Sequence, residues 1–359
     1  MTPRSKVIRQ ADILAPVNSR GQRTDNNWQQ ALANVVRTPG ELFSLLQLDP
    51  SQLTGARAAA SDFSIRVPRS FVDRMSKGDW QDPLLQQVLP QAQELDHQPG
   101  FSADPLSEAE YNPMPGLIQK YKGRVLLIVS RGCAVNCRYC FRRHFNYQNN
   151  KPSRQQWQQT LDYIRNDDSI REVILSGGDP LVANDSMLGD LVNHIAGIAH
   201  ITTLRIHSRL PIVIPQRINT ECLNWLTRTR LQTVLVVHTN HPNEIDDEVA
   251  AVLKRVRNSG ITLLNQTVLL RGINDDAGTL GQLSHRLFQC GALPYYLHLL
   301  DKVQGSAHFQ VSEQQGRQLI QSMLSQLPGY LVPRLVKEVA GASSKVPVDS
   351  LLSHPIQQG

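Results

Sequence analysis

The 359-residue chain has few cysteines, few aromatic residues and no long apolar run. Three of its five cysteines lie close together and two are isolated, which argues against the distributed disulfides of a small secreted domain. No stretch of about 18 apolar residues would span a membrane. Residues 1–16 lack the apolar segment of a signal peptide. We therefore expect a protein of a reducing, cytoplasmic compartment with no membrane partner.

The charge of the chain is moderately basic and evenly spread. The net charge is +6, and 37 basic residues are distributed without a concentrated tail. Such a balance suits anionic cofactors or acidic partners, but it does not indicate stable nucleic-acid binding. A hydrophobic fraction of 40% and a charged fraction of 19% indicate that most of the chain folds around a sizeable core.

The chain divides into a helical first part and a regular second part. Residues 27–46 show helical spacing of apolar residues, broken at Pro39 and Gly40. From residue 125, short apolar runs alternate with helical segments at intervals of roughly 30 residues, the length of a βαβ unit. Six such units predict an α/β fold, a partial six-unit (β/α) barrel with outer helices. The expected strands are residues 125–129, 173–175, 204–206, 234–237, 262–264 and 295–300, and the expected helices include 157–164, 187–195 and 249–256.

Polar residues follow most of the expected strands. In a barrel of this type, the carboxyl ends of the strands form the active-site face. Polar residues at the end of a single strand are common in any loop, but their presence after most of the expected strands indicates an enzyme. The set comprises Arg131, Gly132, Cys133, Ser176, Gly177, Gly178, Asp179, His207, Ser208, Arg209, His238, Thr239, Asn240, Asn265, Gln266, His298 and Asp301.

The three clustered cysteines follow the first expected strand with the spacing C-x₃-C-x₂-C. Cys133, Cys137 and Cys140 on one loop can bind three irons of a four-iron cluster. The fourth iron is then open to the amino and carboxylate groups of S-adenosylmethionine. A structural zinc site is the alternative, and it would need a fourth ligand such as His144. An iron–sulfur electron carrier would instead need a fully ligated cluster.

A glycine pair follows the second expected strand, in Ser176, Gly177, Gly178 and Asp179. Glycines let a backbone approach a ligand closely. We expect free backbone groups in this turn to bind the amino group of S-adenosylmethionine.

Four longer strings resemble the lysine 2,3-aminomutases, a family of radical S-adenosylmethionine enzymes. The resemblance covers roughly residues 100–350 and is strongest to the bacterial branch that supplies β-lysine for modifying translation elongation factor P. It implies an isomerase that converts L-α-lysine to β-lysine through a 5′-deoxyadenosyl radical, with an external reductant. The strings are residues 137–143 (CRYCFRR), 205–211 (RIHSRLP), 238–244 (HTNHPNE) and 265–275 (NQTVLLRGIND).

The resemblance also implies roles for individual residues. Lys345, in the small-residue loop 341–347, matches the lysine that carries pyridoxal 5′-phosphate. Arg142 matches the arginine that binds the substrate carboxylate, a planar anion that suits a guanidinium fork. Asp301 and Glu338 match two acids that bind the distal ammonium, although relatives carry Asp in place of Glu338. The other matches are Lys120, Tyr121 and Arg124 around the pyridoxal phosphate, and His238 and Gln266 toward S-adenosylmethionine.

Two further departures from the family pattern concern His298 and the C-terminus. His298 replaces a family tyrosine near the pyridoxal phosphate, and no role is assigned to it. The chain ends 14 residues after Lys345 without the cysteine-bearing extension of many relatives, so we expect a monomer or a small homo-oligomer.

The expected organisation has three parts. These are a helical N-terminal region 1–115, a core barrel 116–330 of the radical S-adenosylmethionine type, and a C-terminal segment 331–359 with the lysine for pyridoxal phosphate. A radical enzyme acting on RNA, or on another amino acid, is the alternative function. No appended basic module supports the RNA reading.

Overall fold

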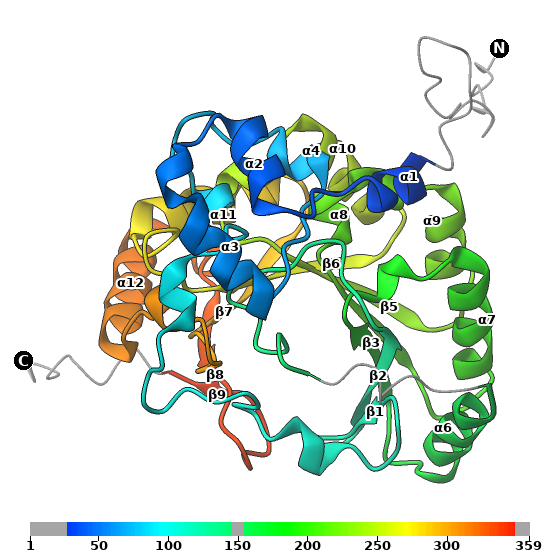
Figure 1. Ribbon diagram of the computed structural model, residues 1–359. Helices are drawn as coiled ribbons and strands as arrows, with labels where there is room; N and C mark the ends of the chain where they lie inside the picture. Colours follow the sequence, from blue (N-terminus) through cyan, green and yellow to red (C-terminus); the bar gives the residue numbers. More distant parts are fainter. Residues whose placement is uncertain (1–26, 146–153, 349–359) are drawn as a thin grey trace, which may run out of the picture.

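The computed structural model describes residues 27–145 and 154–348 (Figure 1). Its sheet has nine strands that lie side by side in chain order. Seven consecutive strands, β2 to β8, are parallel, while β1 and β9 pair antiparallel at the two edges. The strands are β1 (Leu117–Ile118), β2 (Arg124–Ser130), β3 (Glu172–Gly177), β4 (Thr203–Ser208), β5 (Gln232–His238), β6 (Thr262–Val268), β7 (Leu293–His298), β8 (Arg334–Lys337) and β9 (Val346–Pro347).

Helices line the outside of the curved sheet (Figure 1). Helix α10 shows why: Val249, Val252, Leu253 and Val256 are buried at helical spacing and form one apolar face. Its start is fixed by Asp246, whose side chain accepts a hydrogen bond from the Val249 N–H. The outer helices are α6 (Arg154–Asn166), α7 (Asp185–Ala196), α9 (Thr220–Thr227), α10 (Asp247–Asn258), α11 (Ala277–Gln289) and α12 (Glu313–Gln326). The short helix α8 (Leu210–Val213), which follows β4, is instead buried at all four of its residues.

The partial barrel predicted from the sequence is confirmed. Each of the six predicted apolar runs lies on a parallel strand, although β7 ends at His298 and not at residue 300. The prediction missed β8, a seventh parallel strand. Only Leu335 and Val336 of its four residues are buried, which is too short an apolar run to stand out in the sequence.

The N-terminal helices cover one end of the barrel (Figure 1). The predicted break in the helical stretch 27–46 is present, but it lies at residues 34–38, directly before the proline. Pro39 begins α2 (Pro39–Leu46), and Thr38 caps it by accepting from the Glu41 N–H. Proline suits a first helical position, where its missing N–H needs no partner. The other helices of this region are α1 (Asn27–Ala33), α3 (Leu53–Asp62), α4 (Arg69–Val72) and α5 (Pro83–Gln86).

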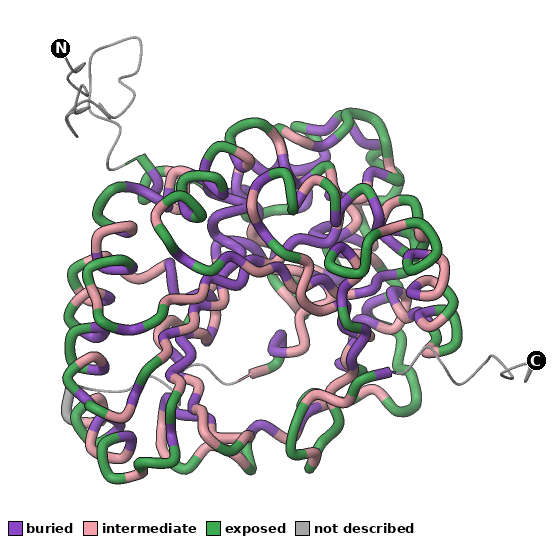
Figure 2. The backbone as a smooth tube through the Cα atoms, turned by 180° about the vertical axis from the view of Figure 1, so that it is seen from behind, coloured by how far each residue is buried: buried purple, intermediate pink, exposed green. Residues whose placement is uncertain are grey.

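A buried interior runs through both the barrel and its N-terminal cover (Figure 2). One apolar cluster includes Leu42 and Phe71 from the cover together with Val173 and Leu204 from the strands. The division at residues 115 and 330 stays a prediction. None of the helices in the described ranges is long and apolar enough to cross a bilayer. Short 3₁₀ turns complete the described chain: η2 (Pro50–Gln52), η3 (Ala92–Leu95), η4 (Glu108–Tyr111), η5 (Pro180–Val182), η6 (Pro215–Arg217), η7 (Pro242–Glu244), η8 (Ala307–Phe309) and η9 (Gly329–Leu331).

Candidate active site

The glycine pair after β3 packs directly against the cysteine loop. The Gly178 N–H donates to the Ser130 carbonyl at 2.9 Å, and the Asp179 N–H donates to the Gly132 carbonyl at 3.0 Å. A Cβ at Gly178 would lie 2.4 Å from the Gly132 oxygen, and Gly177 has a φ of +116°. Glycine is therefore required for this close approach. These two N–H groups are used within the fold, and a ligand ammonium needs acceptors, so the carbonyl oxygens of the turn are the backbone groups suited to it. The predicted contact of this turn with S-adenosylmethionine stays a prediction.

Asp179 joins the ends of β3 and β4. Its carboxylate accepts from Ser208 Oγ at 2.7 Å and from the backbone N–H groups of Arg209 at 2.7 Å and Leu210 at 3.1 Å. A further bond comes from the Leu181 N–H at 3.0 Å. Burial raises the pKa of Asp179, while these hydrogen bonds act in the opposite direction. Asp179 thus holds the active-site loops in place, and its predicted contact with S-adenosylmethionine stays a prediction.

The three cysteines of the loop between β2 and α6 are free thiols that are partly exposed. Burial raises the pKa of Cys140 to about 11 and that of Cys133 well above its ordinary value, so a bound cation is needed to keep them as thiolates. Arg209 Nη1 donates to Cys137 Sγ at 2.6 Å. The donor set fits an iron–sulfur cluster, in which each cysteine binds a different iron.

The zinc alternative finds no support in the described part of the chain. No three His, Cys, Asp or Glu side chains there converge on a single-ion site. His144, the fourth ligand that zinc would need, instead lies 3.3 Å from the Gln304 carbonyl through its Nε2. Cys222 and Cys290 are buried elsewhere in the fold.

Arg142 forms a two-pronged ion pair that the sequence did not predict. Its Nε and Nη2 each lie 2.7 Å from an oxygen of Glu108. Its Nη1 lies 3.3 Å from Ser176 Oγ and 3.5 Å from the Gly177 carbonyl. Arg142 and Glu108 line a cavity of about 450 Å³, together with Phe141. Arg142 therefore has the fork geometry for a carboxylate, and Glu108 is the carboxylate that it binds in this structure.

The residues predicted around pyridoxal phosphate converge on Glu338. Its carboxylate pairs with Lys345 Nζ, lies 3.2 Å from Lys120 Nζ and accepts from Tyr121 Oη. The Arg124 guanidinium lies over the Tyr121 ring at 4.7 Å. Residues 120–124 belong to the β1–β2 edge of the sheet and residues 338–345 to the β8–β9 edge. The two open edges of the barrel thus meet through these side chains.

This cationic and aromatic group fits pyridoxal phosphate. Lys120 and Arg124 supply positive charge suited to its phosphate, and Lys345 supplies a primary amine whose Nζ is 5.8 Å from the Tyr296 ring centre. His298 adds a buried imidazole whose Nε2 has no hydrogen-bond partner among the described residues. An unpartnered buried polar atom indicates a missing ligand or water.

Asp301 and Glu338 have very different proton affinities. Burial, and secondarily the negative charge of Glu338, raises the pKa of Asp301 to about 7. Burial would also raise the pKa of Glu338, but the charges and hydrogen bonds of Lys345, Tyr121 and Lys120 outweigh it and lower that pKa to about 2. At neutral pH, Glu338 is therefore ionised, whereas Asp301 holds its proton much more readily than an ordinary aspartate.

His238 and Gln266 lie side by side at paired positions of β5 and β6. Their side-chain nitrogens are 3.1 Å apart, and the His207 ring packs edge-on to His238 at 5.7 Å. Burial lowers the pKa of His238 to about 3, so its ring is neutral. Gln266 Oε1 is buried without a partner in the described residues, which suits a ligand between these strands and the cysteine loop.

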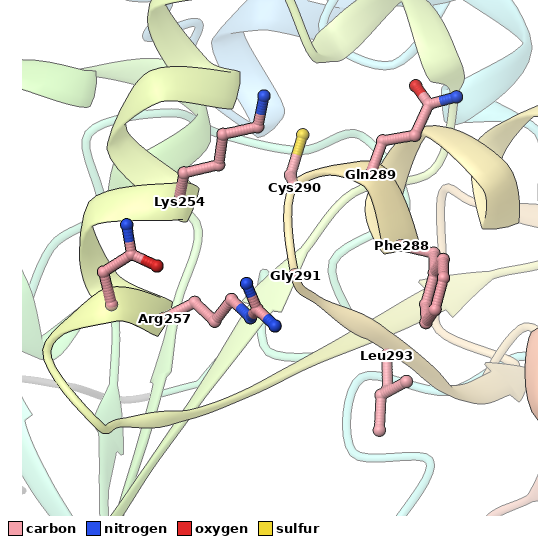
Figure 3. A pocket seen from close by; sticks show the side chains of 8 residues that line it. Lys254, Arg257, Phe288, Gln289, Cys290, Gly291 and Leu293 are labelled. Atoms are coloured by element: carbon pink, nitrogen blue, oxygen red, sulfur yellow. The ribbon is translucent and has the colours of Figure 1, made fainter.

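A second pocket, of about 480 Å³, lies away from all of these residues. Lys254, Arg257, Phe288 and Cys290 line it where α10 and α11 end (Figure 3). In a barrel of parallel units, the outer helices run antiparallel to the strands. The carboxyl ends of the helices therefore lie at the face opposite the carboxyl ends of the strands. No residue of the predicted site lines this pocket.

The observed fold and site define a class: a partial α/β barrel whose first loop carries the three-cysteine motif of radical S-adenosylmethionine enzymes. Residues 121–206 match a family model described as a 4Fe-4S single cluster domain. The chain is 50% identical to the L-lysine 2,3-aminomutase of Escherichia coli K12, over 90% of this chain and 94% of that protein. It is 49% identical to the L-lysine 2,3-aminomutase of Haemophilus influenzae, over 90% of this chain and 96% of that protein.

This chain belongs to the L-lysine 2,3-aminomutase family, and the match at residues 121–206 supports a 4Fe-4S cluster in the region of the three cysteines. A solved structure, Streptococcus suis SuiB, aligns at a TM-score of 0.45 with 11% identity, over 61% of this chain and 50% of that chain. That likeness is too small to support an argument.

Proposed function

We propose that this protein converts L-lysine to β-lysine by radical chemistry that uses S-adenosylmethionine, with pyridoxal phosphate held on Lys345. The observation that carries the proposal is the meeting of Lys345, Lys120 and Tyr121 at Glu338 across the open edges of the barrel. The amine for the cofactor and an acid for the substrate's distal ammonium thus belong to one site. The 50% identity to a protein named for this activity supports it.

The two bound groups divide the chemistry. The reduced cluster supplies the electron that cleaves S-adenosylmethionine, and pyridoxal phosphate supplies a ring that delocalises the radical during nitrogen migration. The protein's part is to bind, orient and enclose the reactants.

Arg142 and the two acids place the substrate between them. The Arg142 fork suits the α-carboxylate of lysine, which would replace or share the contact now made by Glu108. Glu338, ionised at neutral pH, binds the distal ammonium, and Asp301 adds a second carboxylate above its pKa of about 7. The reacting carbon then lies between the cysteine loop and Lys345.

Glu338 links the proposed cofactor lysine to the proposed substrate site. In this structure it pairs with the Lys345 ammonium. Lys345 would hold pyridoxal phosphate through its amine, so Glu338 would lie beside the bound cofactor, where its carboxylate suits the ammonium of the substrate.

The cellular role follows the resemblance of the chain to the bacterial branch described above. The β-lysine would be used to modify translation elongation factor P, in the cytoplasm, with electrons from an external reductant. We expect a monomer or a small homo-oligomer. The support for these statements is the sequence resemblance.

The test is anaerobic incubation of the cluster- and pyridoxal-loaded protein with L-lysine, S-adenosylmethionine and dithionite. The expected product is β-lysine. Turnover of lysine should be lost in Lys345→Ala. Cleavage of S-adenosylmethionine without any change in lysine would contradict the proposal and would turn attention to another amino acid or to RNA.

A further inference from the structure

Arg209 connects the end of β4 to the cysteine loop. Its side chain is buried, and Nη1 donates to Cys137 Sγ at 2.6 Å and to Tyr139 Oη at 2.6 Å. The guanidinium charge therefore lies directly against one sulfur of the cluster-binding set.

Side chains from distant segments hold Arg209 in this position. Nη2 donates to Gln87 Oε1 at 2.7 Å and to Glu244 Oε2 at 3.1 Å. Asn240 Nδ2 donates to Tyr139 Oη at 2.6 Å and to the same Gln87 oxygen at 2.9 Å. The N-terminal cover, β4 and the loop after β5 thus converge on one sulfur ligand.

Hydrogen bonds and positive charge beside a ligating sulfur favour the reduced form of a cluster, which carries one more negative charge. The effect is strong here because Arg209 and Glu244 are both buried and little screened by water. Glu244 is a negative charge in the same network, so it acts in the opposite direction.

We propose that Arg209 is a positioning residue that fixes Cys137 and raises the reduction potential of the cluster, and that Glu244 moderates this effect. In the step concerned, one electron from an external reductant reduces a 2+ cluster to 1+, with no bond or proton transferred. The proposal rests on the cluster and not on the proposed lysine reaction, so each can fail separately.

The experiment is an anaerobic redox titration of the loaded protein, in which electron paramagnetic resonance measures the reduced cluster. Arg209→Gln should reduce the equilibrium constant for cluster reduction about tenfold, a shift of about 59 mV to more negative potential for one electron. Arg209→Lys should retain part of the parent potential. Glu244→Gln should shift the potential to more positive values.

A buried arginine outside the network provides the matched control. Arg217 bonds through Nε to the Leu181 carbonyl at 2.6 Å and pairs with Asp185 at 2.8 Å. Arg217→Gln should leave the potential unchanged. If Arg209→Gln loses its cluster, the reduction potential of Glu244→Gln becomes the test, and a shift to more positive potential is the expected result.

Unchanged potentials in both Arg209→Gln and Glu244→Gln, or shifts of the same sign, would overturn the proposal. Opposite shifts support it whether or not lysine is converted. A purely structural role would lower cluster content without this pattern of signs.

Discussion

Buried charged groups have different partners on the cysteine side and on the Lys345 side of the barrel. Beside the cysteines, Asp179 and Arg209 are each held by several fixed protein partners on neighbouring loops. Beside Lys345, one acid, Glu338, takes donors from both open edges of the sheet, and Asp301 keeps a pKa near 7.

This difference matches what each side has to do. A cluster that gains an electron in each reaction cycle benefits from a rigid surrounding, because a preorganised environment does not have to rearrange at each turnover. On the proposed function, the Lys345 side loads a cofactor and then binds a charged substrate, which requires partners that exchange. The following predictions test this contrast in order of decreasing effect.

Replacing a cysteine of the loop should have the largest effect. Cys137→Ser removes the ligand of one iron, so we expect complete loss of the brown chromophore and of S-adenosylmethionine cleavage. Iron analysis and 5′-deoxyadenosine formation measure both. Cys222→Ser and Cys290→Ser are the controls and should retain both properties. Full cleavage by Cys137→Ser would disprove the assignment.

Asp179→Ala should destabilise the protein by about 2–5 kcal/mol, because it leaves buried backbone N–H groups at Arg209, Leu210 and Leu181 without an acceptor. Urea unfolding measures this change. Asp301→Asn is the control on the other side and should not destabilise the fold. Equal losses in the two variants would show that the contrast is wrong.

Asp301→Asn and Glu338→Gln should each weaken lysine turnover about tenfold to a hundredfold, since a charge-assisted hydrogen bond is worth about 1.5–3 kcal/mol. Each change removes charge and nearly preserves volume. Steady-state kinetics should show a raised KM for lysine, while cluster content and the pyridoxal adduct of Asp301→Asn stay at parent levels. Parent-like turnover in both variants would make these acids structural.

The pH dependence should follow Asp301. Its pKa of about 7 lies above the ordinary value for aspartate, so the carboxylate is ionised above pH 7 and loses its charge as the pH falls. We expect kcat/KM for lysine to fall by up to about tenfold per pH unit below 7 through this group. Asp301→Asn should lack this limb, and a limb that persists in the variant would assign it to another group.

The sequence predicted those parts of the molecule whose signal is local. The cysteine spacing, the six apolar runs and the glycine pair each lie within a few residues, and the structure confirms the barrel. The clustering of Lys120, Tyr121 and Lys345 came from resemblance, and the structure brings these residues together at Glu338.

The parts that sequence reasoning missed depend on contacts between distant segments. Glu108 lies in an ordinary polar stretch, and only the fold places it on Arg142. Arg209 stood among the polar strand endings, but its bond to Gln87 spans 122 positions. Glu244 lies within the string 238–244 that resembles the family, but only the fold shows that its carboxylate accepts from Arg209.

The most direct test of two separate cofactor sites compares Lys345→Ala with Cys137→Ser. Iron content and the borohydride-trapped pyridoxal adduct are measured in parallel in both proteins. The account predicts that Lys345→Ala keeps its iron and loses the adduct, while Cys137→Ser loses its iron and keeps the adduct on Lys345. An adduct that maps to another lysine, or a loss of both groups in each variant, would contradict it.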